Sequence, residues 1–336
     1  MRVLVVAERA DGRSAPQVAA EVARAWHEHR PQDALAALPL SDGGPGLLDV
    51  VGDARDTWVT TEVAGPHGHP VEAAFLLRPD GTAIIEAARA AAPSLAPGGQ
   101  ADLTLTTSFG AGELVQAALD TGARRLVVGV AGLAAADGGA GALTGLGFRL
   151  RVEDGSGLKI GGGDLHRIRR VERGWAQVPD GVEVVVLADT EADLTGAPAT
   201  LPAEVVVADE QRAAATAALA TWRTVVERDL DCPGLGASPG AGAGGGLAFG
   251  LAAALRAAIR PAAVGVWDLQ GGDGRLQDCD GMVVVADPGG AVHRHAAARA
   301  SESDRHLWTV TPPADGVGEG DGPADWAERV ASVLAS

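Results

Sequence analysis

The stretch GVAGLAAADGGAGALTGLG, residues 129–147, decides the fold, because its glycines and single aspartate join an apolar run to a predicted helix. The residues LVVG that lead into it predict a buried strand, and the glycines after Asp137 permit a tight turn. In open α/β sheets, ligands bind at such turns, at the carboxyl ends of the strands. Most positions where a ligand loop would carry polar side chains hold alanine or leucine. The stretch therefore predicts an α/β fold and a ligand loop with few polar groups.

A second copy of this turn occurs earlier in the chain. DGGPGLL begins at Asp42 and DGGAGAL begins at Asp137, so the two segments share D-G-G-x-G-x-L. Each lies between a predicted strand and a predicted helix. An aspartate in that place is commonly a helix N-cap, which is the structural alternative to a ligand site. The presence of two copies favours a ligand site over a simple helix N-cap at both aspartates.

Strands and helices alternate over most of the chain, which indicates a mostly parallel sheet. Around residues 57–90, the segments TWVTTEVAG, HPVEAAFLLRPDG and TAIIEAA predict hairpin strands and hence a mixed sheet. We therefore predict two α/β domains, one with a mostly parallel Rossmann-like sheet and one with a mixed sheet. The Rossmann-like domain is assigned to residues 1–56 plus about 235–336, and the second α/β domain to residues of about 57–234.

Three helices follow from the spacing and type of apolar residues. Val18, Val22 and Trp26 recur on one face of a helix that begins with a capping-box pattern. Residues 211–228 form an alanine-rich segment, which predicts a second helix. The segment LAFGLAAALRAAI from Leu247 predicts a third, buried helix.

Composition excludes several classes of partner. The chain has 44 acidic and 27 basic residues and a formal net charge of −17, whereas binding to nucleic acid or to an anionic membrane rests on a basic face. The N-terminal MRVLVV predicts a first strand rather than a signal peptide. The isolated Cys232 and Cys279 favour a reducing compartment without structural zinc. We expect a cytoplasmic protein that binds neither nucleic acid nor membrane.

Four blocks of sequence resemble, in order, those of the type-1 glycerate kinase family. They are PLSDGGPGLLDVV, TTSFGAGELVQAALDTGARRLVVGVAGLAAADGGAGALTGLG, IGGGDLHRI and PGAGAGGGLAFGL. The resemblance implies phosphorylation of D-glycerate, or of a related small hydroxy acid, by ATP with Mg²⁺. It also implies a two-domain α/β fold with a cleft between the domains. The expected partners are a hydroxy acid and a nucleotide, and the oligomeric state stays open.

The resemblance also implies roles for individual residues. Asp42 and Asp137 are expected to be catalytic by orienting or deprotonating the substrate hydroxyl, and Asp189 is expected to help hold Mg²⁺. Backbone N–H groups at glycine turns are suited to cradle phosphates. The residues expected to bind phosphate or substrate are Ser41, Gly43, Gly44, Ser108, Gly110, Gly112, Glu113, Gly138, Gly139, Gly242 and Gly244.

Several polar positions of the family pattern are replaced here. Leu133, Ala135 and Ala136 stand where the family has serine, threonine and asparagine, and the lysine of the family's first loop is absent. Phosphoryl transfer needs cations or N–H donors around the phosphates. The basic residues that could substitute are Arg9, Arg13, Lys159 and Arg275.

This pattern leaves an alternative to a working kinase. Glycines needed for folding are kept while polar residues become alanine, leucine or proline, as expected of a catalytically silent homologue that acts as a ligand-binding or regulatory module. An NAD-dependent enzyme is disfavoured, because the G-x-G-x-x-G match at residues 240–245 follows no predicted strand.

Overall fold

The structure is a computed structural model that describes residues 1–96, 102–159, 161–177, 181–312 and 326–335. The chain divides into two compact units. The first comprises Met1–Asp42, Asp49–Val51 and Ala263–Ser336, and the second comprises Gly43–Leu48 and Gly52–Ala262. The chain thus returns to the first unit at Ala263, whereas the sequence places this return near residue 235. The difference arises because the glycine loop after residue 239 and the helix that follows it pack into the core of the second unit.

The first unit contains a fully parallel sheet of strand order β12-β11-β1-β2. Its strands are β1 (Arg2–Ala7), β2 (Ala34–Pro39), β11 (Gly281–Val285) and β12 (His306–Val310). Its helices are α1 (Ala15–His29), α8 (Ala262–Leu269), α9 (Gly272–Gln277), α10 (Ala291–Glu302) and α11 (Trp326–Leu334). The predicted Rossmann-like parallel sheet is confirmed, because apolar strands such as β1 and β11 alternate with helices that cover them.

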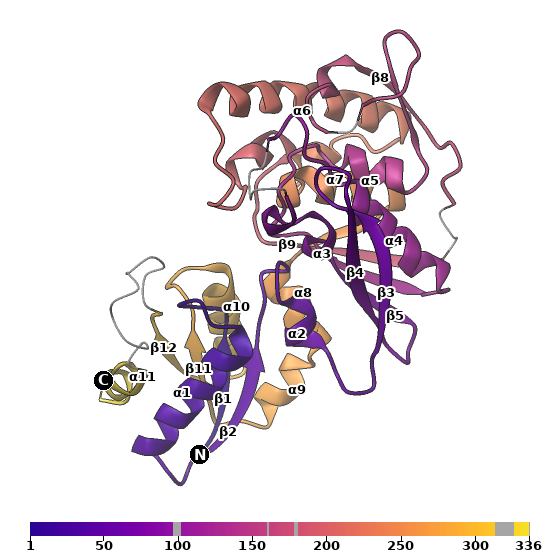
Figure 1. Cartoon of the computed structure of the whole chain (residues 1–336). Helices are drawn as coiled ribbons and strands as arrows, with labels where there is room; N and C mark the ends of the chain where they lie inside the picture. The colour runs from indigo at the N-terminus through magenta and orange to yellow at the C-terminus, as the bar shows by residue number, and fades with distance from the viewer. Residues whose placement is uncertain (97–101, 160, 178–180, 313–325, 336) are drawn as a thin grey trace. The chain divides into compact units, whose positions relative to one another are not determined.

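Helix α1 forms as its sequence predicts. Val18, Val22 and Trp26 are fully buried, and the backbone N–H of Ser14 donates to Gln17 Oε1 at 2.9 Å. The indole N–H of Trp26 donates to Asp33 at 3.0 Å, which satisfies the buried ring's only polar group. Helix α11 packs beside α1 over the same core (Figure 1).

The second unit contains a mixed sheet of strand order β10-β9-β6-β5-β4-β3. Its strands are β3 (Thr57–Ala64), β4 (Pro70–Leu77), β5 (Thr82–Glu86), β6 (Arg125–Gly129), β9 (Glu183–Ala188) and β10 (Ala258–Pro261). β3, β4 and β5 pair antiparallel, whereas β5, β6, β9 and β10 pair parallel. The predicted mixed sheet around residues 57–90 is therefore confirmed.

Helices of the second unit share one core with a face of this sheet. They are α3 (Ala88–Ala91), α4 (Phe109–Asp120), α5 (Ala140–Gly145), α6 (Asp209–Asp229) and α7 (Leu247–Leu255). The short helix α2 (Leu47–Val51) is divided between the units, with Leu47 and Leu48 in the second and Asp49–Val51 in the first. The short 3₁₀ helices are η1 (Pro93–Leu95), η3 (Leu165–Arg167), η4 (Leu194–Ala199), η5 (Leu235–Ala237) and η6 (Ala243–Gly246). α4 and α5 pack against each other, as Figure 1 shows.

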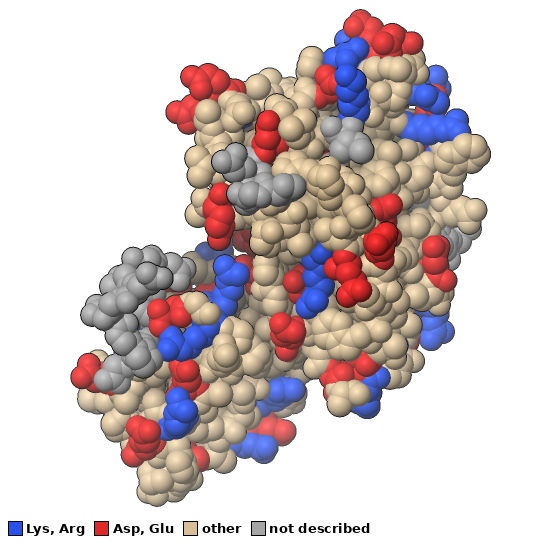
Figure 2. Space-filling model, in the orientation of Figure 1, with Lys and Arg blue, Asp and Glu red and all other residues tan. Residues whose placement is uncertain are grey.

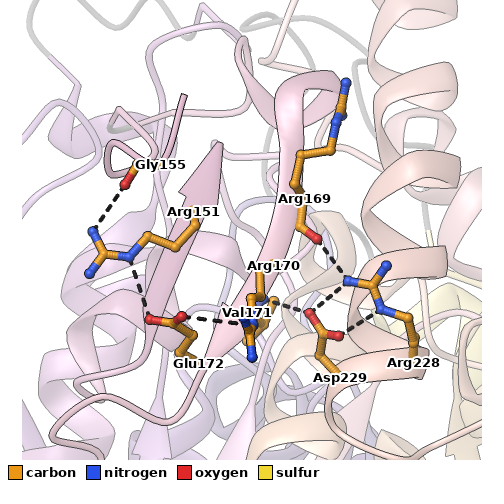
Figure 3. Close-up of polar contacts among 8 residues, drawn as sticks. All are labelled: Arg151, Gly155, Arg169, Arg170, Val171, Glu172, Arg228 and Asp229. Carbon is orange, nitrogen blue, oxygen red and sulfur yellow. Dashed lines mark hydrogen bonds and ion pairs between the residues drawn. The ribbon is translucent and has the colours of Figure 1, made fainter. Parts of the chain in front are cut away.

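A two-stranded hairpin, β7 (Arg149–Val152) and β8 (Ile168–Glu172), is fastened to the end of α6 (Figure 3). Arg228 donates to the carbonyl of Arg169 at 2.7 Å, and Asp229 accepts the backbone N–H of Val171 at 2.8 Å. These contacts hold the carboxyl-terminal end of α6, the helix that carries the fully buried Trp222.

Charged side chains of both signs are interspersed over the face drawn in Figure 2, so the field over that face has no single sign. No helix within the described residues has both the length and the apolar composition needed to cross a membrane.

Candidate active site

Asp137 lies at the centre of the glycine turn that opens α5, and it is buried with 2% of its surface exposed. Its carboxylate accepts the backbone N–H of Ser108 at 2.8 Å, of Gly139 at 3.0 Å and of Gly141 at 3.1 Å. It also accepts the hydroxyl of Ser108 at 2.8 Å. The hydroxyl of Thr107 donates to it at 3.3 Å. One carboxylate thus satisfies backbone donors at the starts of both α4 and α5.

Burial raises the pKa of Asp137, while the hydrogen bonds from Ser108, Gly141 and Gly139 oppose that rise. The hydroxyl of Ser108 in turn accepts the backbone N–H of Ala142 at 3.0 Å. The carboxylate therefore faces protein donors on both oxygens. Through these hydrogen bonds, Asp137 fixes the backbone of the glycine turn and joins it to the start of α4.

The glycine loop before α7 interlocks with the turn around Asp137. The backbone N–H of Gly138 donates to Gly245 O at 3.0 Å, and the indole of Trp222 donates to Gly138 O at 2.9 Å. A Cβ at Gly245 would lie 1.7 Å from Ala135 O, and one at Gly244 would lie 2.3 Å from Val130 O. Only glycine allows the two backbones to approach this closely.

The other DGG turn reaches the same edge of the second sheet. A Cβ at Gly129 would lie 2.2 Å from Gly43 O, and Gly43 itself packs against Leu187 at the end of β9. Glu86, the last residue of β5, is buried and accepts the backbone N–H of Leu48 at 3.2 Å. The carboxyl ends of β5, β6 and β9 thus hold the segment that begins at Gly43, as open α/β sheets hold ligand loops.

The predicted binding residues in α4 have packing partners. A Cβ at Gly110 would lie 1.7 Å from Ala64 O, and one at Gly112 would lie 2.2 Å from Ala142 O. Glu113 accepts the backbone N–H of Ala64 at 2.7 Å. These contacts explain the residues by close packing of α4 against β3 and α5, and their binding role stays a prediction.

Two further predicted positions lie near the end of β9. Asp189 directly follows that strand and is exposed. Gly242 is buried where a Cβ would meet Asp193 O at 2.2 Å, so its lack of a side chain has a packing reason. The backbone N–H of Gly242 donates to Ala192 O at 2.9 Å, which leaves that N–H engaged.

In the first unit, acidic side chains end three neighbouring strands: Glu8 follows β1, Asp42 follows β2 and Asp287 follows β11. Asp42 is exposed and its neighbour Ser41 is buried. Burial, together with the nearby carboxylates of Asp287 and Asp42, raises the pKa of Glu8 to about 7. A carboxyl group that titrates near neutrality is suited to acid–base work. Glu8 was not predicted from the sequence, although an acidic residue directly after an apolar strand is a readable signal.

The raised pKa of Glu8 predicts a pH-dependent stability of the first unit. The unfolded chain loses the Glu8 proton near 4.5, whereas the folded chain retains it up to about 7. Between these values the folded state binds more protons, so the free energy of unfolding falls as pH rises through this window, by at most about 3 kcal/mol. Urea unfolding at pH 5 and pH 8 measures the fall. Glu8→Gln is expected to remove this fall in the free energy of unfolding, whereas Glu28→Gln, at an exposed residue of α1, should keep it. An equal fall in both variants would contradict the assignment of the pH dependence to Glu8.

The basic residues expected to substitute for the missing lysine have different surroundings. Arg13 pairs with Asp11 and Glu21, and Arg275 donates to the Ala37 carbonyl at 2.9 Å. Arg9 and Lys159 are exposed. A further basic residue, Arg89, was not predicted from the sequence; it follows β5 and lies close to Glu86.

Metal ligation has limited support in the geometry. Across the described ranges of the chain, no group of three or more His, Cys, Asp and Glu side chains is arranged to hold a metal ion. The residues therefore do not fit a resident metal centre. Mg²⁺ carried by a nucleotide needs only one or two protein carboxylates, and the role of Asp189 in holding it stays a prediction.

The chain is similar in sequence to one known family and to several of its members. The sequence model of the glycerate kinase family matches residues 5–288. The chain is 38% identical over 186 residues to a glycerate kinase of Bacillus subtilis (strain 168), a match covering 54% of this chain and 49% of the relative. It is 36% identical over 165 residues to the glycerate 2-kinase of Escherichia coli (strain K12), covering 47% and 42%. The matched part of the chain thus spans about half the length, or less, of these curated relatives.

The similarity extends to a solved structure. A crystal structure of a protein assigned as glycerate kinase 2 in Salmonella typhimurium LT2 superposes with a TM-score of 0.80 at 27% sequence identity. The superposition covers 99% of this chain and 95% of that chain. The arrangement of elements is therefore shared over nearly the whole length.

Proposed function

Because the chain belongs to the glycerate kinase family, as the match over residues 5–288 shows, we propose that it transfers the terminal phosphate of ATP to a hydroxyl of glycerate. Mg²⁺ would enter with the nucleotide, and Asp189 would contribute a single carboxylate to it. The observation that carries the proposal is the pair of DGG turns, one of which lies where the carboxyl ends of β5, β6 and β9 meet.

The proposal gives the two aspartates different tasks. Asp42 is exposed at the end of β2 and would orient or deprotonate the reacting hydroxyl. Glu8, with its pKa near 7, would be a neighbouring acid or base. Asp137 would position the turn through its buried hydrogen bonds, in place of the direct catalytic role predicted from sequence. Phosphoryl transfer depends mostly on such positioning and on charge stabilisation.

Turnover assays test this proposal. The purified protein is supplied with Mg-ATP and D-glycerate, L-glycerate, glycolate or D-lactate, and ADP release is followed. We expect turnover with D-glycerate and a loss of about 100-fold or more in kcat for Asp42→Asn, because general-base catalysis contributes that much. An active family member is the control. Absence of turnover with every acid, beside an active control, would overturn the proposal.

The comparisons do not favour the silent-homologue alternative, since the two curated relatives described above carry the names of kinases. Glycerate is proposed as the substrate and is not taken over from those relatives, because the matched segments cover only part of their length.

A further inference from the structure

Arg89 lies beside the glycine turn of the second unit. It follows Glu86 by three residues and belongs to α3. The backbone N–H of Ala87 donates to Gly129 O at 2.9 Å, and that of Ala134 donates to Ala91 O at 2.8 Å. The segment that carries Arg89 is thus hydrogen-bonded at both ends to the stretch that forms the turn.

The guanidinium group of Arg89 is held in place from two sides. Its Nε lies 3.8 Å from Glu86 Oε1, and its central carbon lies 5.2 Å from the centre of the Trp58 ring. Contact with an aromatic face stabilises a guanidinium group and leaves its edge available for hydrogen bonds. Glu86 also accepts the backbone N–H of Leu48, so the same carboxylate links Arg89 to the segment after Gly43.

The hydrogen-bonding capacity of Arg89 is unused within the described residues. Its Nε is buried without a hydrogen-bond partner, and none of the hydrogen bonds described for this part of the chain comes from its terminal nitrogens. Arg228, in contrast, uses its Nε and one terminal nitrogen in bonds to Asp229 and to the Arg169 carbonyl. The side chain of Arg89 is 30% exposed, so a small ligand can reach it.

We propose that Arg89 binds the carboxylate of the hydroxy acid. A guanidinium fork matches the two oxygens of a carboxylate, whereas phosphates can be held by backbone N–H groups of glycine turns. Arg89 then supplies a cation from α3, next to the carboxyl end of β5. This inference rests on the proposed function, because it names the group that holds the substrate of that site.

The test compares three variants of the full-length protein. Arg89→Gln removes the charge, Arg89→Lys keeps the charge without the fork, and Arg125→Gln is the control. Arg125 is a matched arginine at the opposite, amino end of β6: it lies 3.5 Å from Glu183, its Nε is also buried without a partner, and its side chain is 39% exposed. Steady-state kinetics give the KM for glycerate and for ATP, and calorimetry measures glycerate binding without nucleotide.

For Arg89→Gln we expect the KM for glycerate to rise about 10- to 100-fold, as for a lost charged hydrogen bond, while the KM for ATP stays within about twofold. The KM for glycerate of Arg89→Lys should lie between those of Arg89→Gln and the wild type, and that of Arg125→Gln should equal the wild-type value. An unchanged KM for glycerate in Arg89→Gln, or a rise confined to ATP, would overturn the inference. If the wild type shows no turnover, the proposed function fails, but calorimetry still tests the role of Arg89. Equal glycerate binding in the wild type and Arg89→Gln, or no binding in either, would overturn the inference.

Discussion

Replacing Asp137 with alanine is expected to destabilise the second unit by about 3 kcal/mol or more, because each buried donor left without an acceptor costs about 1–3 kcal/mol. The substitution leaves the buried N–H groups of Ser108 and Gly139, and the partly buried N–H of Gly141, without their acceptor. Urea unfolding followed by circular dichroism measures the loss. Asp189→Ala, which removes the exposed carboxylate after β9, should change stability by no more than about 0.5 kcal/mol.

Asp137→Asn separates a positioning role from a catalytic one. The amide keeps the shape of the side chain but places an N–H₂ group where the carboxylate accepts hydrogen bonds, so we expect a loss of stability here too. An Asp137→Asn protein as stable as the wild type, with kcat lowered about 100-fold or more, would instead support the catalytic role predicted from sequence.

Gly245→Ala is expected to cost about 4 kcal/mol or more and to hinder folding of the second unit. The residue has a φ of 63°, and its Cβ would lie 1.7 Å from Ala135 O, a backbone atom that cannot rotate away. Expression yield and thermal unfolding measure the effect.

Gly122→Ala is the matched control for this substitution. Gly122 has a φ of 80°, but nothing lies within 4 Å of its Cβ position, so only the backbone strain of about 1 kcal/mol applies. Equal losses in the two variants would show that the interlocked turns contribute little beyond strain.

The fold class could be predicted because local patterns and the observed elements agree. Val18, Val22 and Trp26 lie on the buried face of α1, and residues 211–228 lie within α6. The segment from Leu247 was only partly predicted. Its helix ends at Leu255, Arg256 adopts a left-handed conformation, and β10 follows as an edge strand of four residues. A strand so short has no period to detect.

The chemistry of the site was harder to predict. An aspartate before two glycines has the same sequence whether it binds a ligand or caps a helix, and only the approach of Ser108 from another helix reveals the second role for Asp137. Arg89 stands in an alanine-rich segment with no motif. Its pairing with Glu86 joins residues three apart in the sequence, but its contact with Trp58 depends on how β3, β4 and β5 pair. Asp42 and Asp189 remain predictions for catalysis and for Mg²⁺.

The central claim is that this chain phosphorylates glycerate although several polar positions of its family pattern are replaced. ³¹P NMR of the protein with Mg-ATP and D-glycerate tests it most directly, because the transferred phosphate appears as a new phosphomonoester signal. We expect that signal to grow as the terminal ATP signal declines, and not to grow when glycerate is omitted. Absence of the signal, or conversion of ATP to inorganic phosphate alone, beside an active family member, would contradict the claim.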